Sequence, residues 1–331
     1  TLVNKLEKYN SENSGAGAGL NLVLFPYAIE HIVRISRILS IDSGNANALL
    51  VGVGGSGRKS LTTLSAFINE FKVQANENVN EMDFGAWRDH LRTNVIDIVV
   101  SGNELVFLLS DTQITNEAFL EDINNMLNTG EIPNLVESQH LQNYKDNIHP
   151  DYCGGKKLIT DSEILAALIE LCKAKIHIVL CMSPIGEAFR RRVLNLPSLV
   201  NCNTIDWFLP WPEQALSAVA MHYLNDIEVE EQHLHSIINI CVDMQSRVSN
   251  YSELYYQQLR RYYYVTPMSF IELLNLFKNL LKKRSEEIKK EIYRYENGLN
   301  TLEMSEQLVI TMKEQIDKKL QPQLTESKKQ C

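Results

Sequence analysis

The chain has 331 residues, a formal net charge of −9 at pH 7 and 44% hydrophobic residues. A chain of this length predicts roughly two or three structural units with ample apolar material for a core. The negative charge argues against a surface dominated by nucleic-acid binding. The sequence contains neither a signal peptide nor an apolar run long enough to span a bilayer. We therefore expect a soluble cytosolic protein without a membrane partner.

The cysteines and histidines do not predict a metal site. None of the six cysteines belongs to a C-x-x-C pair, and the eight histidines show no zinc-like grouping. We therefore expect reduced thiols in an intracellular compartment rather than disulfides. The cysteines are Cys153, Cys172, Cys181, Cys202, Cys241 and Cys331.

The first 100 residues predict a linker followed by alternating elements. Residues 1–20 are expected to form a flexible N-terminal linker, because they contain the glycine-rich stretch SENSGAGAG. Helical periodicity follows over Leu22–Leu39, and the apolar run Ala48–Val53 predicts a strand. A helix is predicted over Leu61–Phe71 and a second strand over Val95–Val100.

The same alternation continues over the next 80 residues. Strands are predicted over Leu105–Leu109 and Ile176–Cys181, and helices over Glu117–Leu127 and Asp161–Ala174, with a polar insertion at Glu137–Asp151. Strands that alternate with helices predict a parallel sheet with helices on both faces. Ligands of such sheets bind at the carboxyl ends of the strands.

A glycine-rich turn follows the first strand and resembles a phosphate-binding loop. The pattern G-x-x-x-x-G occurs at Gly52 and Gly57, and a helix follows it. Glycines let backbone N–H groups approach phosphate oxygens, and a helix N-terminus favours an anion. The alternative is a glycine-rich turn without a phosphate role. The predicted nucleotide-binding residues are Gly52, Gly54, Gly55, Ser56, Gly57, Arg58, Lys59 and Ser60.

Two residues of the loop depart from the usual pattern. Arg58 stands where a lysine is expected and can supply positive charge to the outer phosphates, although its planar fork changes the geometry. Lys59 replaces the hydroxyl that usually binds Mg²⁺, unless Ser60 or Thr62 takes that role. Nucleotide binding is therefore better supported than hydrolysis.

The strand at Leu105–Leu109 ends in Ser110-Asp111. In P-loop ATPases the corresponding pair holds Mg²⁺ and polarises the attacking water. Ser110 is thus the predicted metal-site residue and Asp111 the predicted catalytic residue, and both functions are expected to be weakened. The alternative is a strand that ends in a polar turn.

Polar residues also follow the strand at Ile176–Cys181. Ser183 is the candidate for a sensor of the γ-phosphate, and the alternative is a helix N-cap. Arg190, Arg191 and Arg192 are candidates for an arginine finger directed at another module, and the alternative is a solvated basic face.

Beyond an aromatic and proline-rich hinge at Trp207–Pro212, the chain is predicted to be helical. Helices at Pro212–Leu224 and Glu230–Arg247 suit a small lid, and a long helix begins at Pro267. Its apolar residues recur every seven positions, which predicts one strand of a coiled coil rather than a lone amphipathic helix. Gly298 and Pro322 are expected to weaken or end this helix. The repeating residues are Leu274, Leu281, Ile288, Tyr295, Leu302, Val309 and Ile316.

Four blocks of the sequence resemble the fourth AAA+ module of a dynein heavy chain, of the axonemal more than the cytoplasmic type. They are VGVGGSGRKSLTTLSAF, SDTQITNEAFLEDINNMLNTGEIPNLV, CMSPIGEAFRRRVLNLPSLVNCNTIDWFLPWP and VTPMSFIELLNLFKNLL. The resemblance implies an α/β P-loop AAA+ module at residues 21–210, a helical lid at 211–272 and the first stalk coiled-coil helix at 273–331. Met268 stands where an arginine often forms a second sensor.

The resemblance also implies cofactors, partners and location. ATP or ADP with Mg²⁺ is the expected cofactor, and the expected partners are adjacent AAA+ modules of the same heavy chain and the returning stalk helix. A microtubule is expected as a partner only through a tip that is not in this sequence. The implied function is a regulatory nucleotide-binding module with weak or no hydrolysis, in a cytoplasmic, cytoskeletal and axonemal setting. A competent ATPase module and a structural module with an empty pocket are the alternatives.

Overall fold

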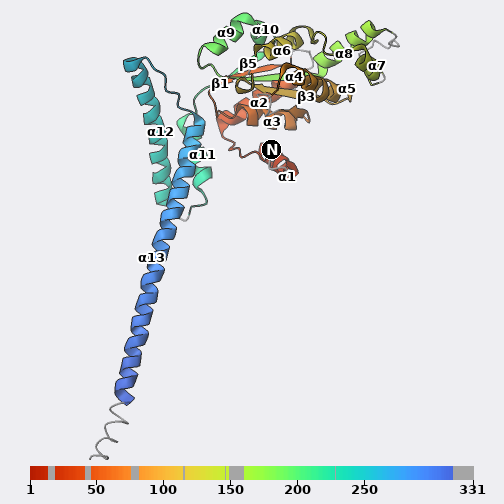
Figure 1. Cartoon of the computed structure of the whole chain (residues 1–331). Coiled ribbons are helices and arrows are strands. Elements are labelled where there is room, and N and C mark those ends of the chain that lie inside the picture. Colours follow the sequence, from red (N-terminus) through yellow and green to blue (C-terminus); the bar gives the residue numbers. More distant parts are fainter. Residues whose placement is uncertain are drawn as a thin grey trace, which may run out of the picture. The chain divides into compact units, whose positions relative to one another are not determined.

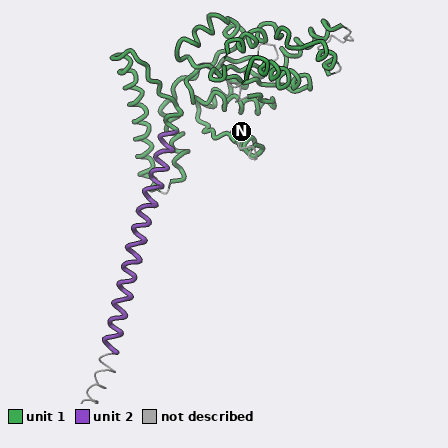
Figure 2. Tube along the Cα trace, in the orientation of Figure 1, with its two compact units in different colours: residues 1–271 green, residues 272–331 purple. Residues whose placement is uncertain are grey.

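The computed structural model describes residues 1–13, 19–41, 46–75, 82–114, 116–145, 147–148, 160–227 and 229–315 (Figure 1). The chain divides into two compact units, residues 1–271 and residues 272–331 (Figure 2). The helices are α1 (Leu2–Asn13), α2 (Pro26–Leu39), α3 (Arg58–Ile68), α4 (Phe84–Leu91), α5 (Asp97–Val100), α6 (Glu117–Thr129), α7 (Ser138–Tyr144), α8 (Asp161–Lys175), α9 (Glu187–Asn195), α10 (Ser198–Asn201), α11 (Glu213–Leu224), α12 (Glu231–Leu259) and α13 (Pro267–Gln315).

A parallel sheet forms the centre of the first unit. In the described residues it has five strands in the order β2-β3-β4-β1-β5, and every neighbouring pair is parallel. Val51 lies opposite Met182, and Ser110 lies opposite Cys181, so β1, β4 and β3 end side by side at one edge. The strands are β1 (Ala48–Gly52), β2 (Lys72–Gln74), β3 (Leu105–Ser110), β4 (Ile176–Met182) and β5 (Thr204–Phe208).

Helices cover both faces of this sheet, as the sequence predicts. Successive side chains of a strand point to opposite faces. Leu49 and Val51 of β1 join a buried core with α4, α6 and α8, whereas Leu50, also fully buried, lies between them in the strand and points to the other face. Figure 1 shows α6 and α8 on one side of the sheet and α2 and α3 on the other. The α/β fold with a parallel sheet is therefore confirmed.

The prediction of a strand at Val95–Val100 was wrong. The segment instead forms a π-helical turn, Arg92–Ile96, followed by α5. Its apolar residues at 95, 96, 99 and 100 are all buried, and this spacing places them on one face of a helix. A short apolar run fits a buried strand and a buried helix equally well, so periodicity alone did not separate the two.

The flexible linker expected at residues 1–20 also needs correction. Residues 2–13 form α1, and two contacts fix this helix to the unit. The Tyr9 ring meets Phe67 of α3 edge-on at 5.2 Å between centroids. The Asn10 side chain accepts a hydrogen bond from the Leu20 N–H at 2.7 Å and donates one to the Leu20 carbonyl at 3.1 Å. Residues 14–18, which hold most of the glycine-rich stretch, lie outside the described residues.

Two strands were not predicted from the sequence. β2 is only three residues long and begins with an exposed lysine, so its apolar signal is weak. β5 alternates between exposed positions and the buried residues Asp206 and Phe208, and a charged residue at a buried position conceals the usual pattern. Both strands lie at the edges of the sheet.

Helices follow the sheet, as predicted. α11 packs against α12, and the buried residues of the pair include Leu216, Val219 and Ile238. α12 is longer than predicted, and it ends where Arg260 adopts a left-handed conformation, φ 55°. Seven tyrosines and arginines follow one another closely around this end, at Tyr255, Tyr256, Arg260, Arg261, Tyr262, Tyr263 and Tyr264.

α13 continues without interruption through Gly298 to Gln315. Along its predicted seam Leu274 is buried, whereas Ile288, Tyr295 and Leu302 are each more than half exposed. Such a row of exposed apolar side chains at heptad spacing is typical of a coiled-coil strand without its partner. The predicted seam residue Ile316 and the predicted helix-ending Pro322 lie outside the described residues.

The exposed seam predicts self-association of the chain. Light scattering should give a mass above that of a monomer, and replacing Tyr295 and Leu302 by glutamate should reduce it, because charge at these positions removes the apolar contact. Glutamate at Asn297 and Asn300, which lie off the seam, should leave association unchanged. A strictly monomeric wild-type chain with full amide protection out to Val309 would contradict the unpaired-stalk interpretation.

Candidate nucleotide site

The glycine-rich loop joins the carboxyl end of β1 to the N-terminus of α3. Gly55 and Gly57 adopt positive φ angles of 77° and 89°, a conformation that side-chain-bearing residues rarely adopt. Gly57 is the N-cap of α3, and its carbonyl accepts the N–H of Leu61 at 2.9 Å. The free N–H groups of the first turn therefore point toward the loop, which is the arrangement of an anion site.

The surroundings of the loop fit a phosphate group. A Cβ on Gly52 would lie 2.6 Å from the Phe208 Cβ, so this position is closed to any side chain, whereas a Cβ on Gly54 would meet nothing within 4 Å. Ser56 is buried, and its hydroxyl has no hydrogen-bond partner among the described residues. A buried hydroxyl without a partner costs free energy, and a phosphate oxygen is a suitable acceptor for it.

Arg58 is buried, and its guanidinium is engaged by backbone carbonyls. It donates to the Met182 carbonyl at 2.5 Å and to those of Leu50 and Val53 at 3.4 Å each. The side chain thus ties the loop to the ends of β1 and β4. The predicted role at the outer phosphates would require these donors to be released. Of the next two residues, Lys59 is exposed and Ser60 is partly exposed.

The thiol beside this arginine is not a nucleophile. Burial raises the pKa of Cys181 to about 12, against the opposing effect of the positive charges of Arg58 and Lys59. Cys181 is therefore protonated at neutral pH and packs as an apolar residue. It is one of four cysteines that the structure describes, all of them free.

The hydroxyl of Ser110 is engaged within its own turn. Ser110 is buried; its Oγ lies 2.9 Å from the Thr112 Oγ1 and donates to the Asp111 Oδ1 at 3.4 Å, and its N–H donates to the Gln113 Oε1 at 2.8 Å. Mg²⁺ prefers oxygen ligands in near-octahedral geometry. A buried hydroxyl that already bonds to its neighbours fits a metal-site role poorly.

The second carboxylate oxygen of Asp111 is also engaged. Asp111 Oδ2 accepts the backbone N–H of Ser183 at 2.7 Å, a charge-assisted bond that joins the ends of β3 and β4. The Ser183 hydroxyl accepts the N–H of Ile185 at 3.4 Å. The alternative of Ser183 as the N-cap of the next helix does not hold, because Gly186 occupies that position. The structure therefore brings Asp111 and Ser183 together.

Two of the three arginines of α9 contact one carboxylate. Arg191 Nη2 and Arg192 Nε each lie 3.4 Å from the Glu117 Oε1 at the start of α6. Arg192 also donates to the Ile114 carbonyl at 3.5 Å, and only 11% of its side chain is exposed. Arg190 is exposed. Two carboxylates thus join the segment after β3 to the segment after β4. Asp111 accepts the Ser183 N–H, and Glu117 pairs with Arg191 and Arg192.

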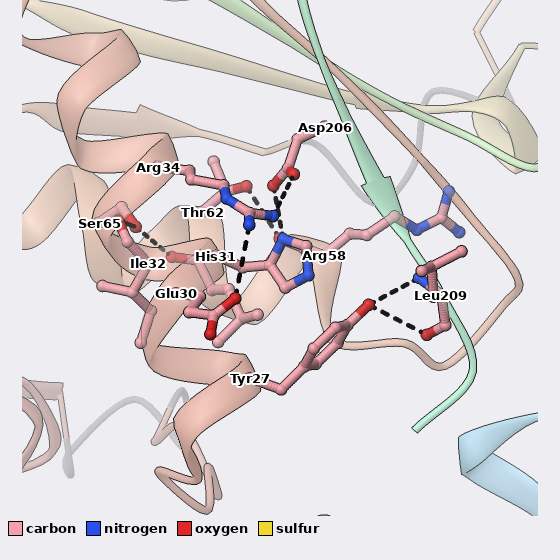
Figure 3. Close-up of polar contacts among 11 residues, drawn as sticks. Tyr27, Glu30, His31, Ile32, Arg34, Arg58, Thr62, Ser65, Asp206 and Leu209 are labelled. Atoms are coloured by element: carbon pink, nitrogen blue, oxygen red, sulfur yellow. Dashed lines mark hydrogen bonds and ion pairs between the residues drawn. The ribbon is translucent and has the colours of Figure 1, made fainter. Parts of the chain in front are cut away.

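A polar cluster that the sequence analysis missed supports the loop from the side of β5. His31 of α2 is fully buried, and its Nδ1 lies 2.6 Å from the Asp206 Oδ2 (Figure 3). Because a carboxylate only accepts, the Nδ1–H donates to it. Asp206 Oδ1 also accepts from Arg34 at 3.4 Å, and the Tyr27 hydroxyl bonds to the Leu209 backbone.

This cluster fixes the wall behind the loop. The His31 ring stacks on Phe208 with centroids 3.9 Å apart and planes 15° apart, and Phe208 is the residue that closes the space beside Gly52. Burial raises the pKa of Tyr27, so its hydroxyl is neutral at pH 7. Helix α2, strand β5 and the glycine loop are therefore packed as one block.

Comparison with known families identifies the chain. Residues 20–280 match the family described as the P-loop containing dynein motor region D4. The chain belongs to this family. The D4 module is 40% identical over 327 residues to human dynein axonemal heavy chain 1, and 41% identical over 310 residues to human dynein axonemal heavy chain 6. It is 37% identical over 322 residues to the Dynein-1-beta heavy chain of the flagellar inner arm I1 complex of Chlamydomonas reinhardtii.

These matches cover nearly all of the D4 module but little of each relative. They include 98%, 93% and 96% of this chain, whereas the chain spans only about 8%, 7% and 7% of the three relatives. The predicted membership of the axonemal dynein heavy chains is confirmed, and with it the cytoskeletal, axonemal setting. In the described residues, no helix is long and apolar enough to cross a membrane.

The D4 family implies nucleotide binding, generally with Mg²⁺. The loop of this D4 module fits a nucleotide phosphate, through its glycines and the free Ser56 hydroxyl. The fit to Mg²⁺ is poor, because the Ser110 hydroxyl and the Asp111 carboxylate already have partners. Across the part of the chain that the structure describes, no group of three or more His, Cys, Asp or Glu side chains is placed to hold a metal ion.

The buried cluster of the D4 module predicts a large loss of stability in Asp206→Ala. Removing the Asp206 carboxylate leaves the buried His31 Nδ1–H without its acceptor, and an unsatisfied buried donor costs about 1–3 kcal/mol. Glu30→Ala is the control, because Glu30 pairs with Arg34 at the surface and such pairs contribute about 0–1 kcal/mol. Urea unfolding measures both. Equal free energies of unfolding for the two variants would show that the cluster does not fix β5.

Proposed function

We propose that this D4 module is a regulatory nucleotide-binding module of an axonemal dynein heavy chain. It binds ADP or ATP in the glycine loop, hydrolyses it weakly or not at all, and transmits the occupancy of the loop to the stalk helix α13. The observation that carries binding is the buried Ser56 hydroxyl, which has no partner among the described residues, in a loop whose Gly54 faces open space. The bound nucleotide would supply negative charge, and the chain's own residues would position it.

The proposed residue roles follow from their places in the structure. Backbone N–H groups of Gly54, Gly55 and Gly57 and the first turn of α3 would hold the phosphates, with Ser56, Lys59 and Ser60 beside them. Arg58 would stabilise the loop through its hydrogen bonds to three backbone carbonyls. Ser183 would act as a sensor, because its backbone N–H donates to the Asp111 carboxylate.

Weak hydrolysis is proposed because the groups that turnover needs are engaged elsewhere. Asp111 accepts the Ser183 N–H and would have to leave it before polarising a water. The Ser110 hydroxyl is bonded within its turn and would retain Mg²⁺ poorly. A competent ATPase would require both contacts to rearrange. Asp111 itself is the observation that favours this second function, because it is a carboxylate at the catalytic position.

The proposed partners are the adjacent modules of the same heavy chain and the returning stalk helix. An exposed apolar stripe on α12 supports the first, because exposed apolar patches mark interaction surfaces. Its residues repeat every three or four positions: Ile240, Met244, Val248, Tyr251, Tyr255 and Leu259. On α9, Arg190 is exposed and is a candidate for an arginine finger directed at a neighbouring nucleotide. The exposed seam of α13 supports the second partner. A microtubule would be reached only through a tip joined to the stalk.

Nucleotide should stabilise the chain. ADP at about 100 times its dissociation constant adds roughly 2.7 kcal/mol to the free energy of unfolding, because it binds the folded state only. Gly57→Val should abolish the resulting shift in Tm, because a branched side chain at φ 89° is strained and occupies the phosphate position. Gly298→Ala is the control, since Gly298 lies in α13 outside the loop and a Cβ there meets nothing within 4 Å. No shift in the wild-type chain with ADP or ATP would contradict the proposal.

Steady-state turnover by the chain should be negligible. It lacks an arginine from a neighbouring module, and such a finger is worth about 10³–10⁵ in rate. The chain is incubated with ATP and Mg²⁺, and released phosphate is measured for the wild type and for Asp111→Asn, which keeps an acceptor for the Ser183 N–H. Turnover near about 1 s⁻¹ that Asp111→Asn removes would instead support the competent ATPase.

A further inference from the structure

The tip of the glycine loop touches the first turn of α13. A Cβ on Gly55 would lie 2.6 Å from the Met268 Cβ, 3.1 Å from the Met268 N and 3.3 Å from the Met268 Cα. Distances below 3 Å do not occur between real non-bonded carbon atoms, so the two backbones approach as closely as packing allows. Both residues belong to the compact unit of residues 1–271.

No other glycine of the loop makes this contact. A Cβ on Gly54 would meet nothing within 4 Å, one on Gly52 would lie against Phe208, and one on Gly57 would come no closer than 3.8 Å to the Leu61 side chain. The approach to α13 therefore depends on one position. Because Gly55 also has a positive φ of 77°, its conformation and its lack of a side chain are both needed there.

The turn that Gly55 touches is held firmly. The Thr266 Oγ1 accepts the N–H of Ser269 at 3.2 Å, and the Thr266 carbonyl accepts the Ser269 hydroxyl at 2.6 Å. Pro267 begins the helix and is buried, and Phe270 is fully buried. A closely packed turn transmits a displacement rather than absorbing it.

We propose that the Gly55–Met268 contact is the point at which occupancy of the loop acts on the stalk helix. This inference rests on the proposed nucleotide binding and names the regulatory contact of that site. A bound phosphate draws the loop's N–H groups toward it and fixes the position of Gly55. Because the first turn of α13 packs directly against Gly55, its position is then fixed as well. α13 continues as one helix to Gln315, so its first turn is part of the stalk helix itself.

The contact is steric rather than ionic. Met268 offers no charge to a phosphate, and the atoms nearest to Gly55 are its backbone and Cβ. The side chain beyond the Cβ is about half exposed and is not needed for the contact. Coupling should therefore survive Met268→Ala, which keeps the Cβ, but not a change that alters the spacing of the two backbones.

Hydrogen exchange of residues 266–271 with and without ADP tests the contact, and Tm shifts measured on the same samples report binding. In the wild type and in Met268→Ala, ADP should slow exchange in this segment by roughly tenfold, as expected when a local opening is suppressed. In Gly55→Ala the added methyl displaces the turn, and the effect of ADP on the segment should be lost. Gly57→Ala controls for strain at positive φ, because its Cβ meets no close neighbour, and it should leave exchange without ADP as in the wild type.

A double variant separates the contact from loop strain. Met268→Gly removes the atom that the new methyl would strike, so Gly55→Ala with Met268→Gly should regain the slowing by ADP, whereas Gly55→Ala with Met268→Ala should not. ADP that raises the Tm without slowing exchange at 266–271 would overturn this inference and leave the proposed binding intact. ADP that changes neither would overturn both.

Discussion

The close approach of backbones around the glycine loop is the constraint on which the site depends. There is no space for a side chain between Gly52 and Phe208, or between Gly55 and Met268. The loop is therefore closely packed on two sides. One contact reaches β5 and, through the stack of His31 on Phe208, helix α2. The other reaches the first turn of α13. The loop therefore contacts both β5 and the first turn of α13, and its shape is set by both.

The charged groups around this loop are mostly engaged by the protein itself. Arg58 is bound by backbone carbonyls, Asp111 by the N–H of Ser183, and Arg192 by Glu117 and a carbonyl. Such contacts fix the carboxyl ends of β1, β3 and β4 relative to one another, and they compete with the roles that the same residues would play in hydrolysis. A site that holds nucleotide while turning it over slowly, in a motor family whose relatives are axonemal dynein heavy chains, is the arrangement that this competition favours.

Much of the fold followed from the sequence, because β1, β3 and β4 are apolar runs that end in polar turns and alternate with helices. The strand predicted at Val95–Val100 is a helical segment instead, because a short apolar run does not carry enough periodicity to separate helix from strand. β5 was missed because Asp206 is buried, and its partner His31 lies 175 residues away. The glycine loop could be placed from its spacing, but the partners of Arg58, Asp111 and Gly55 could not. The distant partners among these, Met182, Ser183 and Met268, are contacted through their backbone or Cβ atoms, which leave no mark in a local pattern.

We propose that the module binds nucleotide and retains it without rapid hydrolysis. The most direct measurement is to load the purified chain with radiolabelled ATP, remove free nucleotide, denature the protein after increasing times and separate the released nucleotides. The account predicts close to one nucleotide per chain, with ATP still largely intact after the time in which an active motor module would have completed many cycles. Protein that retains no nucleotide, or that converts all of its ATP to ADP within seconds, would contradict it.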